Sequence, residues 1–379
     1  MNIRIARFLD KCIGTLLCSF LSIFNKKGKN NKKGGKRFKS ILIVQLWGVG
    51  ETLLTLPAIR AIRMKFTNSR ISVLTTERVK DIFLLDGDVD DVILLRLNPV
   101  SMTKFVLENR KRFDLVIDFE EYLNISAIIS FFVGKYRIGF SQGKRSLLYD
   151  GKVRYDDRQH VVRTFLDLVR LLGIKYDVVK LIKIDIPIKD REFVNNLLRG
   201  YSVTKNNFIV GIAPGAAESA KSRMWPKERF AKLSDILIEK YKAKIIFMGN
   251  KDETELIKKI VELMENKKGV INFAGKVNLR QLFYLIERCN LVVSNDTGPM
   301  HVAAAQRVKA IGLFGPNLPV RWKPYGKGNV ALYKKQECSP CINVHLGQVP
   351  ECKWKGRDYQ KCMKAITVED VLRAVEKVL

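Results

Sequence analysis

The feature that most constrains the fold is a regular alternation of short apolar runs with amphipathic stretches, which begins near residue 40. In the first half of the chain the apolar runs are rich in β-branched residues and occupy 41–46, 71–75, 92–95, 115–118 and 136–138. Helical patterns lie between and after them, at 52–66, 78–85, 101–112, 121–133 and 159–172. Short apolar strands that alternate with helices are typical of a parallel sheet covered on both faces. This half therefore predicts a doubly wound α/β domain.

A second series of the same kind occupies the rest of the chain. Its strands are expected at 208–212, 244–248, 269–273, 291–294 and 309–314, and its helices at 227–241, 253–265, 279–287 and 299–306. Residues 174–206 are less regular and carry polar clusters. We therefore expect two Rossmann-like domains, at 40–180 and 207–379, joined by a linker region at 181–206. Ligands of such sheets bind beside the carboxyl ends of the strands, so a central cleft between the domains is the expected site.

The charge balance indicates what kind of partner to expect. Lys and Arg total 68 against 38 Asp and Glu, which gives a formal net charge of +30. Such a basic chain favours polyanions, namely nucleic acid, phosphate-bearing lipids or nucleotides. The sequence contains no zinc-finger pattern, no RNP-type aromatic motif and no basic zipper, so we expect no nucleic-acid partner.

Residues 1–39 differ from the rest and predict an amphipathic and basic extension that associates with membranes. Thirteen consecutive residues, 12–24, carry no charge, and the stretch that follows, 26–39, holds eight Lys or Arg and no acid. The uncharged run is too short to span a bilayer, and no small-residue cleavage site of a secretory signal follows it. An apolar helix followed by basic residues is typical of an interfacial anchor on an anionic leaflet. A disordered basic tail behind a loosely packed helix is the alternative.

The first segment that could take part in binding or catalysis follows the first expected strand and contains Gly48, Gly50 and Glu51. Glycines there let the backbone approach a ligand, and the helix that follows presents free N–H groups. Glu51 would lie at that helix N-terminus. It is either a capping acid favoured by the helix dipole or a carboxylate able to act as a general base. Asp118 and Glu120, at the end of another strand, are the reserve candidates for a base.

The second segment, residues 213–226, follows the first strand of the second series and contains Ser219, Lys221 and Arg223 among small residues. Basic and hydroxyl side chains at the end of a strand predict a phosphate cradle. An ordinary strand-to-helix loop with solvated basic residues is the alternative.

The third segment, residues 295–305, also leads from a buried strand into a helix and contains Asp296, Thr297, Gly298 and His301. Asp296 or Thr297 could cap that helix, which alone would explain their polarity. The helix N-terminus would equally direct its amides at an anion. His301 is either a hydrogen-bonded structural residue or a participant in the site.

Four cysteines near the C-terminus, Cys338, Cys341, Cys352 and Cys362, form the last candidate group. The first pair has metal-ligand spacing, but the second pair is too widely spaced for an ordinary zinc motif. Free thiols packed in a C-terminal loop are the favoured interpretation, and no metal and no cofactor are expected.

Taken in order, these segments resemble glycosyltransferase family 9, the ADP-heptose:lipopolysaccharide heptosyltransferases, over residues 40–379. The resemblance is most specific at 294–305 and at 313–316, with further matches at 321–326, 53–60, 223–230 and 273–279, and the cysteine-containing tail is similar as well. The family implies a GT-B fold, with the acceptor bound mainly by the N-terminal domain and the nucleotide-sugar mainly by the C-terminal one. It also implies an inverting, metal-independent transfer.

The resemblance assigns expected roles to individual residues. Glu51 occupies the position of the general base, where the family usually has Asp. Lys221, with Arg223 beside it, matches the phosphate-binding position, and Glu253 is the best match for the acid that contacts ribose. Ser219 belongs to the same donor loop, and Asp296, Thr297, Gly298 and His301 match the stretch beside the phosphates and sugar of the donor.

The function expected from residues and resemblance together is transfer of a heptose, or a related sugar, to a lipopolysaccharide core or another lipid-linked glycan. The donor would be a nucleotide-sugar such as ADP-heptose, and the enzyme would be peripheral on the inner face of the cytoplasmic membrane. Two alternatives stay open: a nucleotide-sugar epimerase or hydrolase on the same fold, and a non-catalytic polyanion-binding module on the membrane.

Overall fold

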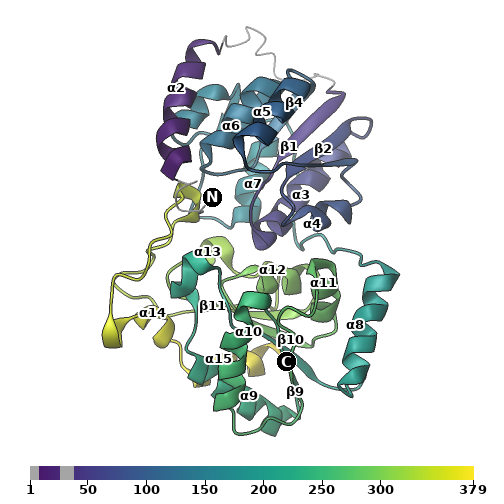
Figure 1. The fold of residues 1–379 in the computed structure, drawn as a ribbon, viewed down its shortest axis with the longest axis vertical. Coiled ribbons are helices and arrows are strands. Elements are labelled where there is room, and N and C mark those ends of the chain that lie inside the picture. The colour runs from purple at the N-terminus through teal and green to yellow at the C-terminus, as the bar shows by residue number, and fades with distance from the viewer. Residues whose placement is uncertain (1–7, 26–37) are drawn as a thin grey trace. The chain divides into compact units, whose positions relative to one another are not determined.

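A computed structural model describes residues 8–25 and 38–379 of the chain. The chain divides into two compact units. The first unit contains the described residues up to Val178 together with His345–Gly347, and the second contains Val179–Val344 and Gln348–Leu379. Figure 1 shows that each unit consists of one sheet with helices around it.

The first unit is built on a six-stranded sheet of order β3-β2-β1-β4-β5-β6, in which every neighbouring pair is parallel. Its strands are β1 (Ser40–Val44), β2 (Arg70–Thr75), β3 (Asp91–Leu94), β4 (Phe113–Asp118), β5 (Gly134–Phe140) and β6 (Gly151–Val153). β1 is central, because Ile43 is in register with Val73 of β2 and with Ile117 of β4. The predicted doubly wound sheet is therefore confirmed, with β6 as an additional short edge strand.

Helices cover both faces of this sheet. They are α3 (Val49–Lys65), α4 (Lys80–Leu84), α5 (Pro99–Glu108), α6 (Asn124–Val133) and α7 (Val161–Arg170). α5 contacts α6, whereas α3 contacts α4 and α7. Leu42 and Val44 of β1 share a hydrophobic cluster with Phe105 of α5 and Val133 of α6. Alternate residues of the buried strand thus pack against opposite helical layers.

A further helical segment precedes the sheet and packs on the first unit. It consists of a π-helical turn, η1 (Asp10–Gly14), followed by α2 (Thr15–Ile23), and it contacts α6 and the short helix η2 (Lys144–Leu148). This segment covers part of the predicted extension, and residues 1–7 and 26–37 of that extension lie outside the described residues. No helix among the described residues is long and apolar enough to cross a membrane.

The second unit repeats the topology of the first. Its sheet has the order β12-β11-β10-β7-β8-β9, again with parallel neighbours throughout. The strands are β7 (Ile209–Ala213), β8 (Lys244–Phe247), β9 (Val270–Asn272), β10 (Leu291–Asn295), β11 (Lys309–Phe314) and β12 (Val330–Tyr333). The strand order in both units is that of a Rossmann fold, in which the order of the strands reverses beside the first one.

The helices of the second unit are α8 (Ile188–Gly200), α9 (Lys227–Tyr241), α10 (Thr254–Leu263), α11 (Leu279–Glu287), α12 (Gly298–Ala305), α13 (Pro319–Trp322), α14 (Lys361–Lys364) and α15 (Val368–Val378). α8 lies within the region predicted as a linker and packs on α11, where Asn195 Nδ2 and the Tyr284 hydroxyl are 3.2 Å apart. Residues 181–206 therefore belong to the second unit rather than to an irregular connection. The pattern was hard to recognise because only Asp190, Val194 and Leu198 of this polar helix are buried.

Candidate functional site

In the first unit, Glu51 lies in the first turn of α3, directly after the loop that leaves β1. Gly48 has a φ of +75°, and a β-carbon at this position would lie 3.2 Å from Glu51 Oε2. The loop thus needs glycine both for its backbone conformation and for the close approach of the carboxylate. The Glu51 side chain is half-buried, and Gly50 beside it is buried.

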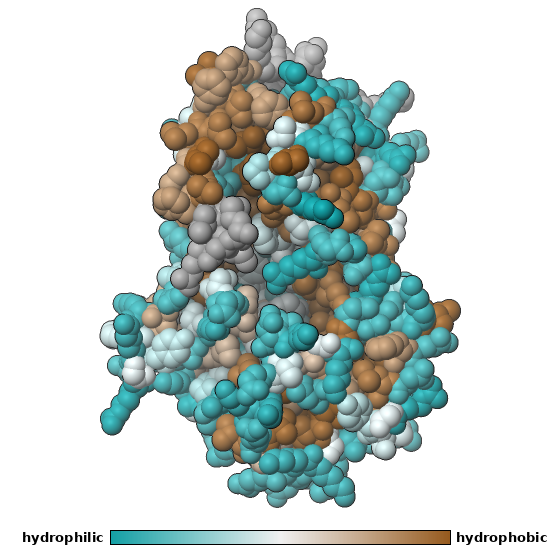
Figure 2. All heavy atoms as spheres, viewed as in Figure 1, coloured by the Kyte–Doolittle hydropathy of each residue, from teal (hydrophilic) through white to brown (hydrophobic). Residues whose placement is uncertain are grey.

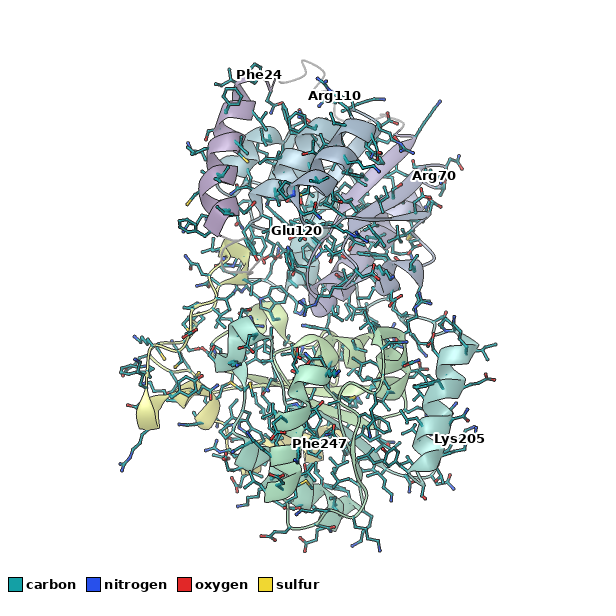
Figure 3. The ribbon with its side chains drawn as sticks, in the orientation of Figure 1. Phe24, Arg70, Arg110, Glu120, Lys205 and Phe247 are labelled. Atoms are coloured by element: carbon teal, nitrogen blue, oxygen red, sulfur yellow. The ribbon has the colours of Figure 1, made fainter. Side chains whose placement is uncertain are left out.

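Two further carboxylates lie near Glu51, just beyond the carboxyl end of β4. Glu120, labelled in Figure 3, accepts a hydrogen bond from the Leu46 amide at 2.5 Å. Glu121 Oε1 accepts one from the Tyr155 hydroxyl at 2.7 Å. Burial raises the pKa of Glu51 well above its usual value, and the negative charges of Glu121 and Glu120 raise it further. A carboxylate with such a raised pKa is suited to take up a proton near neutral pH.

Asp118, one of the two other carboxylates considered as a base, lies in a buried hydrogen-bond network. Its Oδ2 accepts hydrogen bonds from Arg145 Nη2 at 2.9 Å and from the Tyr149 hydroxyl at 2.6 Å, while its Oδ1 accepts one from the Glu120 amide at 3.0 Å. Asp118 has no exposed surface. It therefore holds the loop that carries Glu120, and Glu51 is the carboxylate at this edge that is not fully buried.

The sequence patterns did not single out Glu121 or Arg145 as site residues. Arg145 lies in η2 and also donates from Nη1 to the Glu121 carbonyl at 2.9 Å. Two consecutive glutamates directly after a buried strand were the available signal for Glu121. For Arg145 there was none, because its partner is 27 residues away along the chain.

In the second unit, Asn295 at the end of β10 joins two loops. Its Nδ2 donates to the Pro214 carbonyl at 2.7 Å, and its Oδ1 accepts from the Trp225 amide at 3.0 Å. These bonds hold both ends of the loop after β7, which contains the short helix η3 (Glu218–Arg223). The loop predicted as a phosphate cradle is thereby attached to the strand that precedes Asp296.

Arg223 and Asp296 are brought together at this edge. Arg223 Nη1 lies 3.6 Å from Asp296 Oδ2 and donates to the Asp296 carbonyl at 3.2 Å. Asn317 Nδ2 donates to the same carboxylate at 2.8 Å, and Arg321 Nη2 donates to Asn317 Oδ1 at 3.3 Å. Burial raises the pKa of Asp296, and the neighbouring Arg223 counteracts that rise. The buried Arg223 Nε has no hydrogen-bond partner among the described residues.

The N-terminus of α12 has no side-chain cap. The Thr297 hydroxyl lies 3.1 Å from that of Ser294, and the Asp296 carboxylate is held by Asn317 as described above. Neither side chain caps α12, so the alternative that capping alone explains these polar residues is wrong. Thr297 and Gly298 are half-buried, and Pro299 has no N–H, so the Gly298 amide is the backbone donor that the start of α12 could offer to an anion beside Arg223. His301, one turn further along, is buried.

The other predicted donor residues are placed differently. Lys221 Nζ pairs with Glu218 Oε1 at 2.7 Å, and both side chains are largely exposed. Glu253 Oε2 accepts from the Asn250 amide at 2.7 Å, and a β-carbon on Gly215 would lie 1.7 Å from Glu253 Oε1. Glu253 thus lies against the loop after β7, whereas Lys221 is directed to Glu218 and not to Asp296. Ser219 is half-buried in η3.

The four candidate cysteines are all free thiols, and Cys362 is buried. Burial raises the pKa of Cys362 to about 11. Across the described ranges no group of three or more His, Cys, Asp or Glu side chains is arranged so that it could hold a metal ion. We therefore assign these cysteines no catalytic role.

Comparison with known proteins identifies the family. The sequence model of glycosyltransferase family 9 (heptosyltransferase) matches residues 106–346, which is well over half of the chain. The chain belongs to glycosyltransferase family 9. Membership of family 9 confirms the predicted resemblance and makes this protein a glycosyltransferase.

Relatives within family 9 match over nearly their whole length. Lipooligosaccharide heptosyltransferase 2 of Campylobacter jejuni is 26% identical over 87% of this chain and 96% of its own. The lipopolysaccharide core heptosyltransferase OpsX of Haemophilus influenzae is 25% identical over 89% of this chain and 96% of its own.

Solved structures support the same fold. A family 9 glycosyltransferase from Veillonella parvula has a TM-score of 0.78 at 21% identity and covers 92% of this chain and 99% of its own. Escherichia coli heptosyltransferase WaaC, solved with ADP, has a TM-score of 0.67 at 20% identity and covers 90% of this chain and all of its own. The two Rossmann-like units are thus those of a GT-B glycosyltransferase, as predicted.

Proposed function

We propose that this protein transfers a heptose from ADP-heptose to the core of lipopolysaccharide or a closely related lipid-linked glycan. The observation that carries the proposal is the start of α12, which has no side-chain cap, beside Arg223, because a guanidinium and the Gly298 amide together suit a diphosphate. Relatives that match both units, and are named as lipooligosaccharide or lipopolysaccharide heptosyltransferases, support the choice of sugar and acceptor.

The second unit would bind the donor. As the bond between the anomeric carbon and the diphosphate oxygen breaks, negative charge grows on the leaving ADP. Arg223, whose Nε has no partner among the described residues, would stabilise that charge together with the Gly298 amide at the start of α12. Glu253 would contact the ribose, Thr297 and the Asp296 backbone would line the phosphates, and His301 would support the start of α12. Lys221 and Ser219 would act at the rim of the same loop.

The first unit would bind the acceptor and supply the base. Glu51 would take the proton of the acceptor hydroxyl while that oxygen forms a bond to the anomeric carbon on the face opposite the leaving diphosphate, so that the configuration inverts. The proton ends on Glu51 and the electron pair of the broken bond ends on ADP. The raised pKa of Glu51 favours this proton uptake. The reaction as written uses no cofactor, since Arg223 and the helix amides would stabilise the charge that a metal could otherwise neutralise.

The proposed acceptor carries lipid, so the protein would act as a peripheral protein on the cytoplasmic face of the membrane. The basic composition of the chain is consistent with an anionic surface as a partner.

Product analysis with and without acceptor tests the proposal. Purified protein is incubated with ADP-heptose, and ADP release and glycan mass are followed with and without a lipopolysaccharide core that lacks its heptose. We expect rapid ADP release only with the acceptor, together with a mass gain of one heptose. Equal consumption of the donor with and without acceptor would identify a hydrolase or epimerase instead. Turnover with a different nucleotide-sugar but not with ADP-heptose would refute the assigned donor.

A further inference from the structure

The helical segment η1–α2 is fixed to the first unit at both of its ends. At its start, Asp10 Oδ2 and Oδ1 accept hydrogen bonds from the amides of Asn124 and Ile125, at 2.9 and 2.8 Å. These are the first amides of α6, which has no side-chain cap of its own. At its end, Asn25 donates to the Leu147 carbonyl at 2.7 Å and accepts from Arg137 at 2.9 Å. The segment is therefore a docked element and not a flexible tail.

One face of the segment packs closely on the unit. Gly14 is buried, and a β-carbon there would lie 2.7 Å from Asn124 Cβ, so the close approach to α6 requires glycine. Cys18 has no exposed surface and shares a hydrophobic cluster with Phe131, Leu148 and Tyr149. Residues 10, 14 and 18 thus form a helical stripe that holds the segment against the core.

The opposite face is apolar and exposed. Eight large hydrophobic side chains on this segment and the residues that flank it are at least 38% exposed, and Leu16 and Ile23 are 72% and 76% exposed. The full set is Phe8, Leu9, Ile13, Leu16, Leu17, Phe20, Ile23 and Phe24. Figure 2 shows the brown surface that they form over α2, and Figure 3 shows Phe24 at the outer edge of the unit. A monomeric soluble protein rarely exposes so continuous an apolar face unless the face binds something.

The charges around this apolar face select its partner. Lys11 is exposed within the segment, and Lys144 is exposed on η2, which α2 contacts. The sequence that follows, residues 26–39, contains eight Lys or Arg and no acid. An apolar face with the exposed cations Lys11 and Lys144 beside it matches the boundary between acyl chains and anionic headgroups.

We propose that the exposed face of η1–α2 lies in the interfacial layer of an anionic membrane and holds the first unit there in a fixed orientation. The choice of a membrane as the partner rests on the proposed function, because the acceptor in that function carries lipid. The opposite face of the same helix packs on the buried network of Asp118. Cys18 contacts Tyr149, whose hydroxyl donates to Asp118. A rigid attachment of this kind would present the carboxylates after β1 and β4 at a constant height above the lipid surface.

Charge substitutions on the exposed face test the proposal. In Leu16→Asp/Ile23→Asp both altered side chains are exposed, so the fold should persist. The matched control is Val179→Asp/Ile188→Asp, which places the same charges on apolar residues that are 70% and 74% exposed in the second unit. We expect wild type and control to sediment with vesicles of phosphatidylethanolamine and phosphatidylglycerol. The α2 variant should bind these vesicles at least about tenfold more weakly than wild type.

Cysteine labelling provides a footprint of the same surface. Cys12 is exposed and Cys18 is buried. A water-soluble maleimide, read out by mass spectrometry, should modify Cys12 in free protein and spare Cys18. Anionic vesicles should protect Cys12 in wild type but not in the α2 variant. Modification of Cys18 in free protein would contradict the docked helix, and unprotected Cys12 on sedimented protein would contradict the assigned face.

Other outcomes separate this inference from the proposed function. If light scattering shows a wild-type dimer that the α2 variant converts to a monomer, the face binds a second copy and the membrane proposal is overturned. Transfer to a water-soluble core oligosaccharide should be unchanged in the α2 variant. Vesicle binding by a wild type that shows no such transfer would refute the proposed function and leave the membrane surface supported.

Discussion

Replacing Glu51 by Gln tests the central chemical assignment, because it removes the proton acceptor and keeps the shape of the side chain. If Glu51 is the base, kcat should fall by roughly 10²–10⁴. At 1.36 kcal/mol per tenfold change, this corresponds to about 2.7–5.4 kcal/mol of transition-state stabilisation. If the carboxylate only favours the start of α3 through the helix dipole, its loss should cost at most about 1 kcal/mol of stability and little activity.

The structure also predicts the sign of the stability change. Burial and two neighbouring glutamates raise the pKa of Glu51. The folded state therefore favours the protonated carboxyl, a contribution that is fully present below the unfolded pKa and is lost as the pH rises through the folded pKa. Gln does not titrate, so the stability of Glu51→Gln relative to wild type should increase with pH. Urea denaturation at several pH values measures this difference.

The assay is ADP release with a heptose-deficient core acceptor, combined with calorimetric binding of ADP. Donor affinity should be unchanged, since the carboxylate serves the acceptor. Glu51→Asp should keep measurable turnover, because a carboxylate one methylene shorter remains a base. A kcat within threefold of wild type for a normally folded Glu51→Gln would refute the base assignment, and Glu120 would then be the next residue to test.

Three further outcomes are expected. Arg223→Ala should weaken ADP binding more than Lys221→Ala does, because Arg223 lies beside Asp296 whereas Lys221 is exposed; the reverse order in calorimetry would show that Lys221 reaches the phosphates. Glu121→Gln should move the acidic limb of the kcat/KM profile to lower pH, since a charge that raises the pKa of Glu51 is removed, and an unchanged limb would contradict that coupling. Arg145→Met leaves Asp118 buried without its cation and should cost about 3–5 kcal/mol in urea denaturation, so a loss below 1 kcal/mol would contradict the buried pair.

Periodicity was enough to predict the two sheets, because their central strands are buried on both faces and are apolar throughout. It did not reveal β6 and β12, which are short edge strands with partly exposed residues. It also missed α8, whose buried stripe is narrow. Edge strands and half-exposed helices carry weak patterns because few of their residues contact the core.

The site was predictable only where its residues follow a strand directly. Glu51, Asp296 and Arg223 could be located from the loops after β1, β10 and β7. The choice between Lys221 and Arg223 could not be predicted. Both are basic residues of one loop, and only the folded backbone decides which side chain points toward Asp296. The role of Asp10 could not be predicted either, since it caps a helix that begins more than a hundred residues later.

Both units place their chemistry at the same point of the same topology. In the first sheet the order in which strands are added reverses between β1 and β4, and in the second between β7 and β10. Loops that leave these strands diverge there, so the carboxyl ends of the strands are open to ligands. The first unit places carboxylates at this point and the second places a guanidinium and helix amides. A transfer reaction needs these opposite chemistries, because the acceptor must lose a proton while the leaving diphosphate gains charge. In the proposed reaction, two units with the same strand order would thus each supply one half of the glycosyl transfer, the first the base and the second the stabilisation of the leaving diphosphate.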